Sequence, residues 1–310
     1  FIKSLVKLIL YTTILLLLGL MIPETLYAWG PGAHMSYALS VLEQLKSLHP
    51  QIASLLGTNP QVFLYGTIAA DIILGKKYAG ELYHCHNWKV AFDLLDKAQT
   101  DREKTFIYGY LSHLAVDTVA HNFYVPYKII FSYKHRTLKH TYWEMRFDEK
   151  MDPKVWQTLG ELSESEYLDL DDFLQSHLKR TLFSFKTNKR IFNSLLLLQR
   201  MKRWRRASEL LSKRSIYELK ISEVEEFKKL CLEVVIEFLK NPKKSRVLRA
   251  DPSGKLKLLY AKEIVQDLKR YQRLDLINEE KTNQLITKIR TSFKEGLYQP
   301  VDLPLITDAI

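Results

Sequence analysis

The chain has 310 residues, of which 46% are hydrophobic, and its formal net charge at pH 7 is +11. This length and composition allow a sizeable apolar core. The two cysteines, Cys85 and Cys231, exclude a disulfide-scaffolded class of protein. The sequence contains no internal repeat, low-complexity tract or Gly/Ser linker, so it does not have the pattern of a repeat protein or a disordered chain.

The first 28 residues have the layout of a secretory signal peptide. A basic start is followed by an apolar run from Leu8 to Ile22, and Ala28 stands where the cut is expected. The alternative is a membrane anchor, but this apolar run is shorter than the roughly 20 residues that are needed to span a bilayer. We therefore predict that residues 1–28 are removed and that the mature protein, beginning at Trp29, is secreted or periplasmic.

The rest of the chain has the periodicity of α-helices and lacks clear runs of alternating strand pattern, so we predict an all-α protein. In chain order, the expected helices are one that opens near Gly32 and continues through Leu45, then Phe63–Ile73, His86–Ala98, Glu103–Phe123 and His135–Lys150, the last ended by Asp152-Pro153. The remainder is also predicted to be helical, through about Asn283–Lys294, with breaks at Asn241-Pro242 and Asp251–Gly254.

A row of metal-binding residue types lies within the expected helix over 103–123. His113, Asp117 and His121 follow one another at intervals of four residues, each step turning about 40°, so they form a stripe about 12 Å long. Their neighbours are apolar, which predicts that the stripe is buried. Buried imidazoles and a carboxylate need compensation, which metal ions provide, and Asp117 is placed to bridge neighbouring ions.

Further donors lie on either side of this stripe. His140 and Glu144 form another pair four residues apart, and His86 opens a helix with His84 as a competing neighbour. Asp71 closes the segment 65–71, whose small residues predict that the backbone approaches a ligand closely. Cys85 is a conceivable thiolate ligand, although a small buried residue is the favoured interpretation.

The predicted new chain end can supply a site of its own. If cleavage falls before Trp29, the free amine and carbonyl oxygen of that residue, together with His34, can hold one metal ion. Nitrogen and carboxylate oxygen donors suit zinc, which tolerates open coordination where a substrate enters.

Over roughly residues 29–150 this combination resembles the zinc-dependent phospholipase C family, whose superfamily includes the S1/P1-type nucleases. The matching fragments are Trp29 with His34, Gly66 through Asp71, His86-Asn87-Trp88, His113 through Asp117 with His121, and His140 with Glu144. The family often has Trp close behind the His of the third fragment, which favours His86 over His84. In the best-known secreted members the His after the bridging Asp comes six residues later, whereas here His121 follows by four.

The resemblance implies a multi-helix bundle with additional C-terminal helices and a site for three zinc ions. By that comparison one ion is held by Asp71, His86, His113 and Asp117, a second by His121, His140 and Glu144, and a third by Trp29 and His34, with Asp117 as a bridge. The implied reaction is hydrolysis of a phospholipid to diacylglycerol and a phosphorylated headgroup, with Asp71 orienting the nucleophile. Single-stranded nucleic acid is the alternative substrate, and a non-catalytic metal-binding protein is a third hypothesis.

The two halves of the chain differ in charge. Residues 1–150 carry 15 Lys and Arg against 12 Asp and Glu, whereas residues 151–310 carry 31 against 23. We expect residues 29–150 to form the metal-binding catalytic core and residues 151–310 to complete the fold or to form a second helical subdomain. The densest cationic cluster is expected either to be a solvated face or to contact an anionic membrane surface, and it comprises Arg200, Lys202, Arg203, Arg205 and Arg206.

Overall fold

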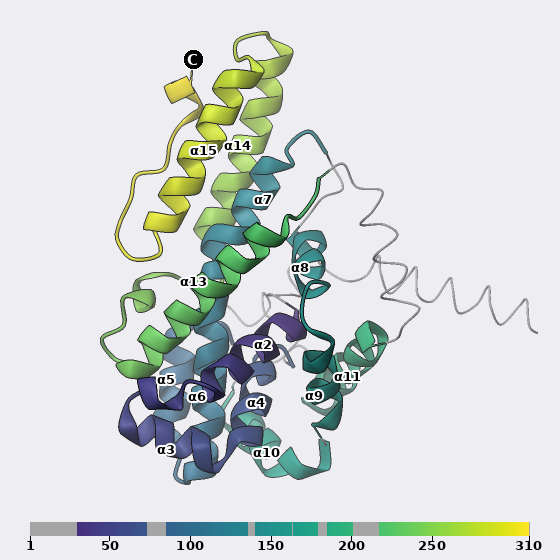
Figure 1. Ribbon diagram of the computed structural model, residues 1–310, viewed down its shortest axis with the longest axis vertical. Helices are drawn as coiled ribbons and strands as arrows, with labels where there is room; N and C mark the ends of the chain where they lie inside the picture. The colour runs from purple at the N-terminus through teal and green to yellow at the C-terminus, as the bar shows by residue number, and fades with distance from the viewer. Residues whose placement is uncertain are drawn as a thin grey trace, which may run out of the picture.

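The computed structural model describes residues 30–72, 85–135, 140–162, 164–178, 185–200 and 217–309. These residues form helices and connecting turns, and no strand occurs among them, which confirms the predicted all-α class (Figure 1). The α-helices are α2 (Pro31–Leu42), α3 (Pro50–Thr58), α4 (Pro60–Ala69), α5 (Trp88–Lys97), α6 (Asp101–Val119), α7 (Val125–Phe131), α8 (His140–Asp148), α9 (Pro153–Glu161), α10 (Leu168–His177), α11 (Phe185–Arg200), α13 (Ile221–Lys240), α14 (Lys255–Arg273) and α15 (Glu279–Glu295).

The shorter elements are single turns. A π-helix, η4 (Ala120–Tyr124), connects α6 directly to α7. The remaining turns are 3-10 helices, namely η1 (Leu45–Ser47), η5 (Glu164–Tyr167), η6 (Arg246–Arg249) and η7 (Ile306–Ala309). The two predicted breaks in the C-terminal half, at Asn241-Pro242 and at 251–254, both lie between helices.

Three predicted helices have wrong boundaries. The helix expected over 63–73 is α4, which begins at Pro60 and ends at Ala69, before Asp71. The first helix ends at Leu42, before a separate 3-10 turn, instead of continuing through Leu45. The helix expected over 135–150 ends at Asp148, because Asp152 and Pro153 belong to the next helix. The Asp152 carboxylate accepts a hydrogen bond from the Lys154 amide at 2.7 Å and so caps α9, where proline is tolerated at the first position.

Helix α6 is the centre of the fold. It begins with a capping box, in which the Thr100 hydroxyl accepts from the Glu103 amide (3.1 Å) and the Glu103 carboxylate accepts from the Thr100 amide (2.9 Å). From Thr105 to Val119 every residue except Tyr108 is buried. Helices α4, α5 and α13 pack around it. A helix buried on all sides in this way can hold polar side chains only if something in the interior pairs with them.

Two glycines allow α4 and α6 to cross at very close range. A Cβ on Gly66 would lie 2.1 Å from the Phe106 carbonyl oxygen, and one on Gly109 would lie 2.3 Å from the Phe63 carbonyl oxygen. The small residue at 66 therefore serves the approach of another helix, which corrects the expectation that it lets the backbone approach a ligand. The close crossing also brings the Thr67 carbonyl to His113.

The C-terminal helices pack on the same core. Helix α13 lies against α6 and α2, and α14 lies against α7 (Figure 1). Phe227 of α13 contacts Phe123 and Tyr124, with ring centroids 4.8 and 4.9 Å apart, and Phe238 stacks on Trp88 at 5.5 Å. The buried apolar residues of both halves form one contiguous cluster.

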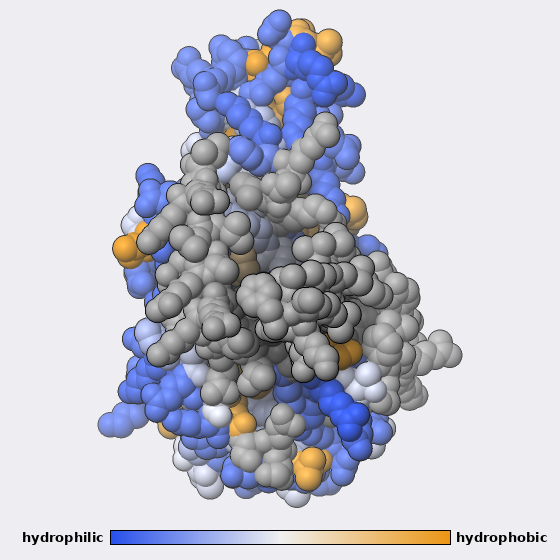
Figure 2. Space-filling view, turned by 90° about the vertical axis from the view of Figure 1, so that its right-hand side faces the viewer, coloured by the Kyte–Doolittle hydropathy of each residue, from blue (hydrophilic) through white to orange (hydrophobic). Residues whose placement is uncertain are grey.

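The surface of the described residues is mostly hydrophilic on the face seen in Figure 2, with isolated hydrophobic side chains at the end formed by α14 and α15. Among the described helices, none is long and apolar enough to cross a membrane. The predicted signal peptide, residues 1–28, lies outside the described residues.

Candidate metal centre

Eight of the predicted metal ligands fall within the described residues, and several elements bring them together. His34 lies on α2, Asp71 just after α4, His86 just before α5, His113 and Asp117 on α6, His121 on the π-helix, and His140 and Glu144 on α8. All are buried except His140, whose side chain is 15% exposed. Three triplets of their ligand atoms each lie within 4.8 Å of one another, namely those of His34, Asp71 and His113, of His86, His113 and Asp117, and of His121, His140 and Glu144.

The first group consists of His86, His113 and Asp117, together with Asp71, which contacts both histidines. The Nε2 atoms of His86 and His113 are 3.0 Å apart, and the Oδ2 atom of Asp117 lies 3.0 and 3.1 Å from them. The Oδ1 atom of Asp71 lies 3.4 Å from the first of these nitrogens and 3.8 Å from the second. Four ligands bound tetrahedrally at about 2.0–2.1 Å from a zinc ion would be roughly 3.3–3.4 Å apart, so this spacing suits one ion.

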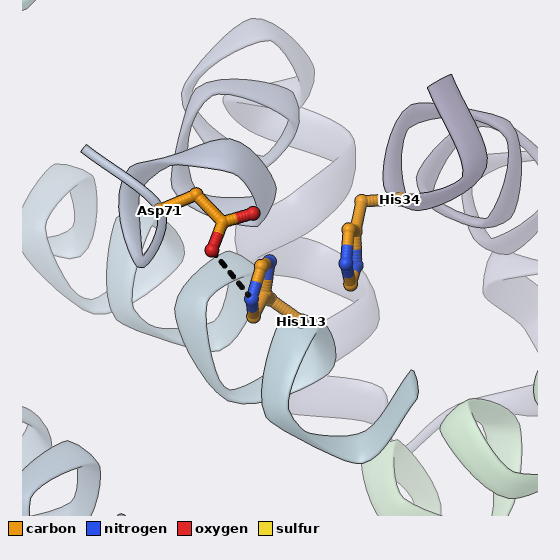
Figure 3. A group of neighbouring side chains, drawn as sticks. All are labelled: His34, Asp71 and His113. Carbon is orange, nitrogen blue, oxygen red and sulfur yellow. Dashed lines mark ion pairs between the residues drawn. The ribbon is translucent and has the colours of Figure 1, made fainter. Parts of the chain in front are cut away.

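The second group contains His34, which forms a triplet with Asp71 and His113 and also contacts the other side of Asp117. The His34 Nε2 atom is 3.3 Å from Asp117 Oδ1, whereas Oδ2 faces the first group. The His34 ring stacks on the His113 ring, with centroids 3.8 Å apart and planes 13° from parallel. Figure 3 shows Asp71, His113 and His34 extending toward one another from three separate elements. Asp117 thus presents one oxygen to each group, which is the arrangement of a bridging carboxylate.

The third group consists of His121, His140 and Glu144. The Glu144 Oε1 atom lies 2.6 Å from His140 Nε2 and 3.5 Å from His121 Nε2. The first contact joins residues four apart on α8, and the second joins α8 to the π-helix. The spacing of four residues between Asp117 and His121 therefore places the two side chains in neighbouring groups.

Several atoms of these groups make no hydrogen bond among the described residues, although they are buried. They are both ring nitrogens of His34, both carboxylate oxygens of Asp117, His121 Nε2 and Glu144 Oε2. Each buried polar atom without a partner costs about 1–3 kcal/mol. Their concentration in one place, at short mutual distances, indicates that their lone pairs converge on common points. The donor set therefore fits zinc, since imidazole and carboxylate are its usual ligands besides thiolate.

Backbone carbonyls fix the orientation of two of the imidazoles. The Nδ1 atom of His113 donates to the Thr67 carbonyl at 2.8 Å, and that of His121 donates to the Pro252 carbonyl at 2.7 Å. Because a carbonyl only accepts, each Nδ1 carries the proton and each Nε2 keeps its lone pair for a metal ion. Cys85 is buried, and its Sγ lies 3.3 Å from Nδ1 of His86, the ring nitrogen opposite the one that joins the first group.

The electrostatics of the site are those of a buried charged cluster. Burial raises the pKa of Glu144 to about 8, against the opposing effect of His121. Burial would also raise the pKa of Asp117, but His113 and His121 hold it well below its ordinary range. Burial, together with neighbouring His34, lowers the pKa of His113. At neutral pH the structure thus favours a neutral His113 beside an ionised Asp117, the protonation states that bind a metal ion.

Asp148 is a residue of this site that the sequence reasoning missed. Its carboxylate accepts from the amides of Gly32 (3.2 Å) and Ala33 (2.8 Å), so it caps α2 from α8 and fixes the helix that carries His34. A Cβ on Gly30 would lie 2.0 Å from this carboxylate. Burial raises the pKa of Asp148 to about 7. The available signal was its position four residues after Glu144, together with the glycines before His34.

Other residues considered from the sequence lie elsewhere. Tyr110 is fully buried and its hydroxyl donates to the Cys85 carbonyl at 2.5 Å, so it packs in the core. Trp29, a predicted ligand, and His84, the alternative to His86, lie outside the described residues. So do Lys202, Arg203, Arg205 and Arg206 of the cationic cluster. Arg200 is the last residue of α11.

Fold and site together define an all-α protein with buried His, Asp and Glu clusters that could hold divalent metal. A family model described as zinc-dependent phospholipase C matches residues 33–193, slightly more than half of the chain. The chain therefore belongs to the zinc-dependent phospholipase C family, a family of phosphodiester hydrolases. The match extends the region of resemblance past residue 150. No curated protein and no solved structure matches the chain.

Proposed function

We propose that this protein is a phospholipase C that uses zinc to hydrolyse a phospholipid to diacylglycerol and a phosphorylated headgroup. The observation that carries the proposal is the position of Asp117, whose two oxygens face His34 on one side and His86 with His113 on the other. A protein that keeps zinc only for structure usually fills every coordination position with its own ligands. Here the third group offers three described ligands, and His34 shares the Asp117 carboxylate with the first group, which suits an open, catalytic centre.

Three ions are proposed. The first group would hold one through His86, His113 and Asp117 with Asp71 beside them, and the third group would hold another through His121, His140 and Glu144. His34 and Asp117 would hold the last one together with the amine and carbonyl oxygen of Trp29, if the leader is removed. When bound, zinc lowers the pKa of a coordinated water from 15.7 toward about 7 and stabilises charge on the phosphoryl group and the leaving oxygen.

Residues of the chain would bind the ions and orient the metal ligands and the attacking water. Asp71 is the most exposed member of the first group, at 6%, and it lies at the end of α4. In the proposed site its carboxylate would bind the first ion and accept a hydrogen bond from the attacking water. The Nδ1 contacts of His113 and His121 keep both rings in one tautomer, so their Nε2 atoms need no rearrangement.

The substrate class is tested with three substrates in parallel. The protein beginning at Trp29 is loaded with zinc and assayed on phosphatidylcholine vesicles, phosphatidylinositol vesicles and single-stranded DNA. Release of diacylglycerol from either lipid is expected. Release of nucleotides without diacylglycerol would instead identify a nuclease, and zinc binding without either product would identify a non-catalytic metal-binding protein.

A matched pair of variants shows whether the activity belongs to this centre. Asp117→Asn should lower diacylglycerol release by at least about 10²- to 10³-fold. Asp171→Asn is the control, since Asp171 is also a buried carboxylate, held by Tyr65 (2.5 Å) and by Lys189, and lies outside the three groups. Equal activity in both variants would rule out the proposed centre as the source of the reaction.

A further inference from the structure

A loop far along the chain lies directly behind the third group of ligands. Residues 250–254 connect η6 to α14, and three consecutive carbonyls of this loop accept hydrogen bonds from side chains of the N-terminal half. The acceptors are those of Ala250, Asp251 and Pro252, and the donors are Trp88 Nε1 (2.9 Å), Asn122 Nδ2 (2.7 Å) and His121 Nδ1 (2.7 Å), respectively. The loop therefore contacts the π-helix that carries His121, although the two segments are more than a hundred residues apart in the sequence.

Hydrogen bonds within the loop fix its backbone. The Asp251 carboxylate accepts from the amide of Ser253 at 3.0 Å and from its hydroxyl, and the Asp251 carbonyl accepts from the Gly254 amide at 3.0 Å. Gly254 has φ of 58°, the left-handed conformation that favours glycine. These contacts hold the loop's carbonyls in one orientation toward the N-terminal half.

Gly254 also touches the backbone of His121. A Cβ at this position would lie 2.2 Å from the His121 carbonyl oxygen and 2.5 Å from its Cβ. The loop consequently contacts His121 at two points, the backbone through Gly254 and the ring through the Pro252 carbonyl. Both contacts depend on the absence of a side chain at residue 254.

The side chain of Asn122 links the π-helix to the loop through one of its two hydrogen bonds. Its side-chain amide donates to the Thr118 carbonyl (3.0 Å) as well as to the Asp251 carbonyl. In a π-helix the regular i to i−4 hydrogen bonds are interrupted, so a side chain that bonds the preceding turn compensates for part of the loss. The π-turn and the loop thus stabilise each other, and His121 lies between them.

We propose that residues 250–254 complete the metal centre by fixing His121 as a zinc ligand, with Gly254 and Asn122 as positioning residues. The inference rests on the proposed zinc site, and it assigns a role to a segment outside the matched range 33–193. It also implies that the C-terminal half completes the enzyme fold and is not a separate module. Loss of a group that orients a metal-bound histidine typically weakens metal binding 10- to 100-fold.

The test compares two glycine-to-alanine variants of the full protein. Gly254→Ala forces the loop away from His121, whereas Gly57→Ala in α3 is the control, because its new Cβ would meet only Leu45 Cδ1 at 3.4 Å. Zinc binding is measured by competition with a chelator of known affinity, without any substrate. We expect Gly254→Ala to weaken one ion 10- to 100-fold and leave the others unchanged, and Gly57→Ala to match the wild type.

A spectroscopic signal separates positioning from a general loss of structure. In the zinc-loaded wild type, the Nδ1 proton of His121 should appear in long-range proton–nitrogen NMR spectra as a slowly exchanging imidazole proton. The signal should broaden or disappear in Gly254→Ala while the Nδ1 proton of His113, which is held by Thr67, persists. If Gly254→Ala does not fold, Asn122→Ala provides the same two measurements, with about tenfold weaker binding of one ion expected.

The outcomes are distinct. A wild type that binds no zinc would overturn the proposed function itself. A wild type that binds zinc, with a folded Gly254→Ala or Asn122→Ala that binds every ion equally well and keeps the His121 signal, would overturn only the role of the loop.

Discussion

Replacing Asp117 by asparagine should weaken the binding of two of the three proposed zinc ions and leave the third unchanged. Asparagine keeps the shape of the side chain and one oxygen, but it puts a non-ligating NH2 group toward either His34, 3.3 Å from Oδ1, or His86 and His113, 3.0 and 3.1 Å from Oδ2. Whichever way the amide turns, one group loses its carboxylate oxygen and the other receives a neutral oxygen in place of a charged one. Both ions that Asp117 faces should therefore bind more weakly.

The expected magnitude follows from what this carboxylate contributes. Loss of a second-shell partner already weakens metal binding about 10- to 100-fold, and Asp117 is a direct ligand in the proposed site, so each of the two ions should lose at least about 100-fold in affinity. That factor corresponds to about 2.7 kcal/mol per ion. The ion held by His121, His140 and Glu144 makes no contact with the substituted atoms and should remain. Turnover should fall by at least about 10²- to 10³-fold, the usual effect of removing one strong electrostatic stabiliser.

The assay counts zinc per chain by mass spectrometry at a buffered zinc concentration that just saturates the wild type. The wild type should retain three ions and Asp117→Asn about one, with unchanged helical circular dichroism. Asp171→Asn should retain all three. If Asp117→Asn keeps the full zinc content and the full rate, then Asp117 does not bridge two ions and the reasoning from its two-sided geometry is refuted.

Three further outcomes are expected. One extra residue before Trp29 blocks the amine, so that variant should lose one zinc ion and most of its turnover relative to the protein beginning at Trp29; undiminished turnover would count against the amine as a ligand. Because the pKa of Asp148 is raised from about 3.9 to about 7, its carboxyl stays protonated up to a higher pH in the folded protein than in the unfolded chain. The contribution of Asp148 to stability in EDTA should thus fall between pH 4 and 7, by at most about 4 kcal/mol, and level off above. Asp148→Asn should lack this component in urea titrations, and an equal slope in both proteins would contradict it. Gly66→Ala should destabilise by about 1–3 kcal/mol or more in thermal unfolding, since its Cβ would lie 2.1 Å from the Phe106 carbonyl. A Gly66→Ala protein as stable as Gly57→Ala would show that the helix crossing can relax.

The helical class and the ligand groups could be predicted because both depend on local spacing. His113, Asp117 and His121 follow one helix, and His140 with Glu144 follow another, so the 3.6-residue period alone puts each set on one face. The buried character of α6 was also evident from its apolar residues. The capping role of Asp152 was missed because a Pro after an Asp both ends one helix and begins another.

The contacts that orient the ligands could not be predicted from spacing. Asp148 reaches amides 115 and 116 residues earlier in the chain, and His121 reaches a carbonyl 131 residues later. No local pattern specifies such partners, because they depend on how whole helices dock. Gly66 shows the same limit, since a glycine in a helix fits a ligand approach or a helix crossing equally well until the neighbouring element is known.

The shared carboxylate of Asp117 has a consequence for how the centre would fill. One ion arriving at its Oδ2 would hold the side chain in place and remove the repulsion between the lone pairs that crowd there, so the neighbouring position would bind its own ion at a smaller entropic cost. By thermodynamic reciprocity each of the two would strengthen the other by the same factor. Loading of this pair should therefore be cooperative, with a sigmoidal dependence on free zinc, whereas the third position would fill independently.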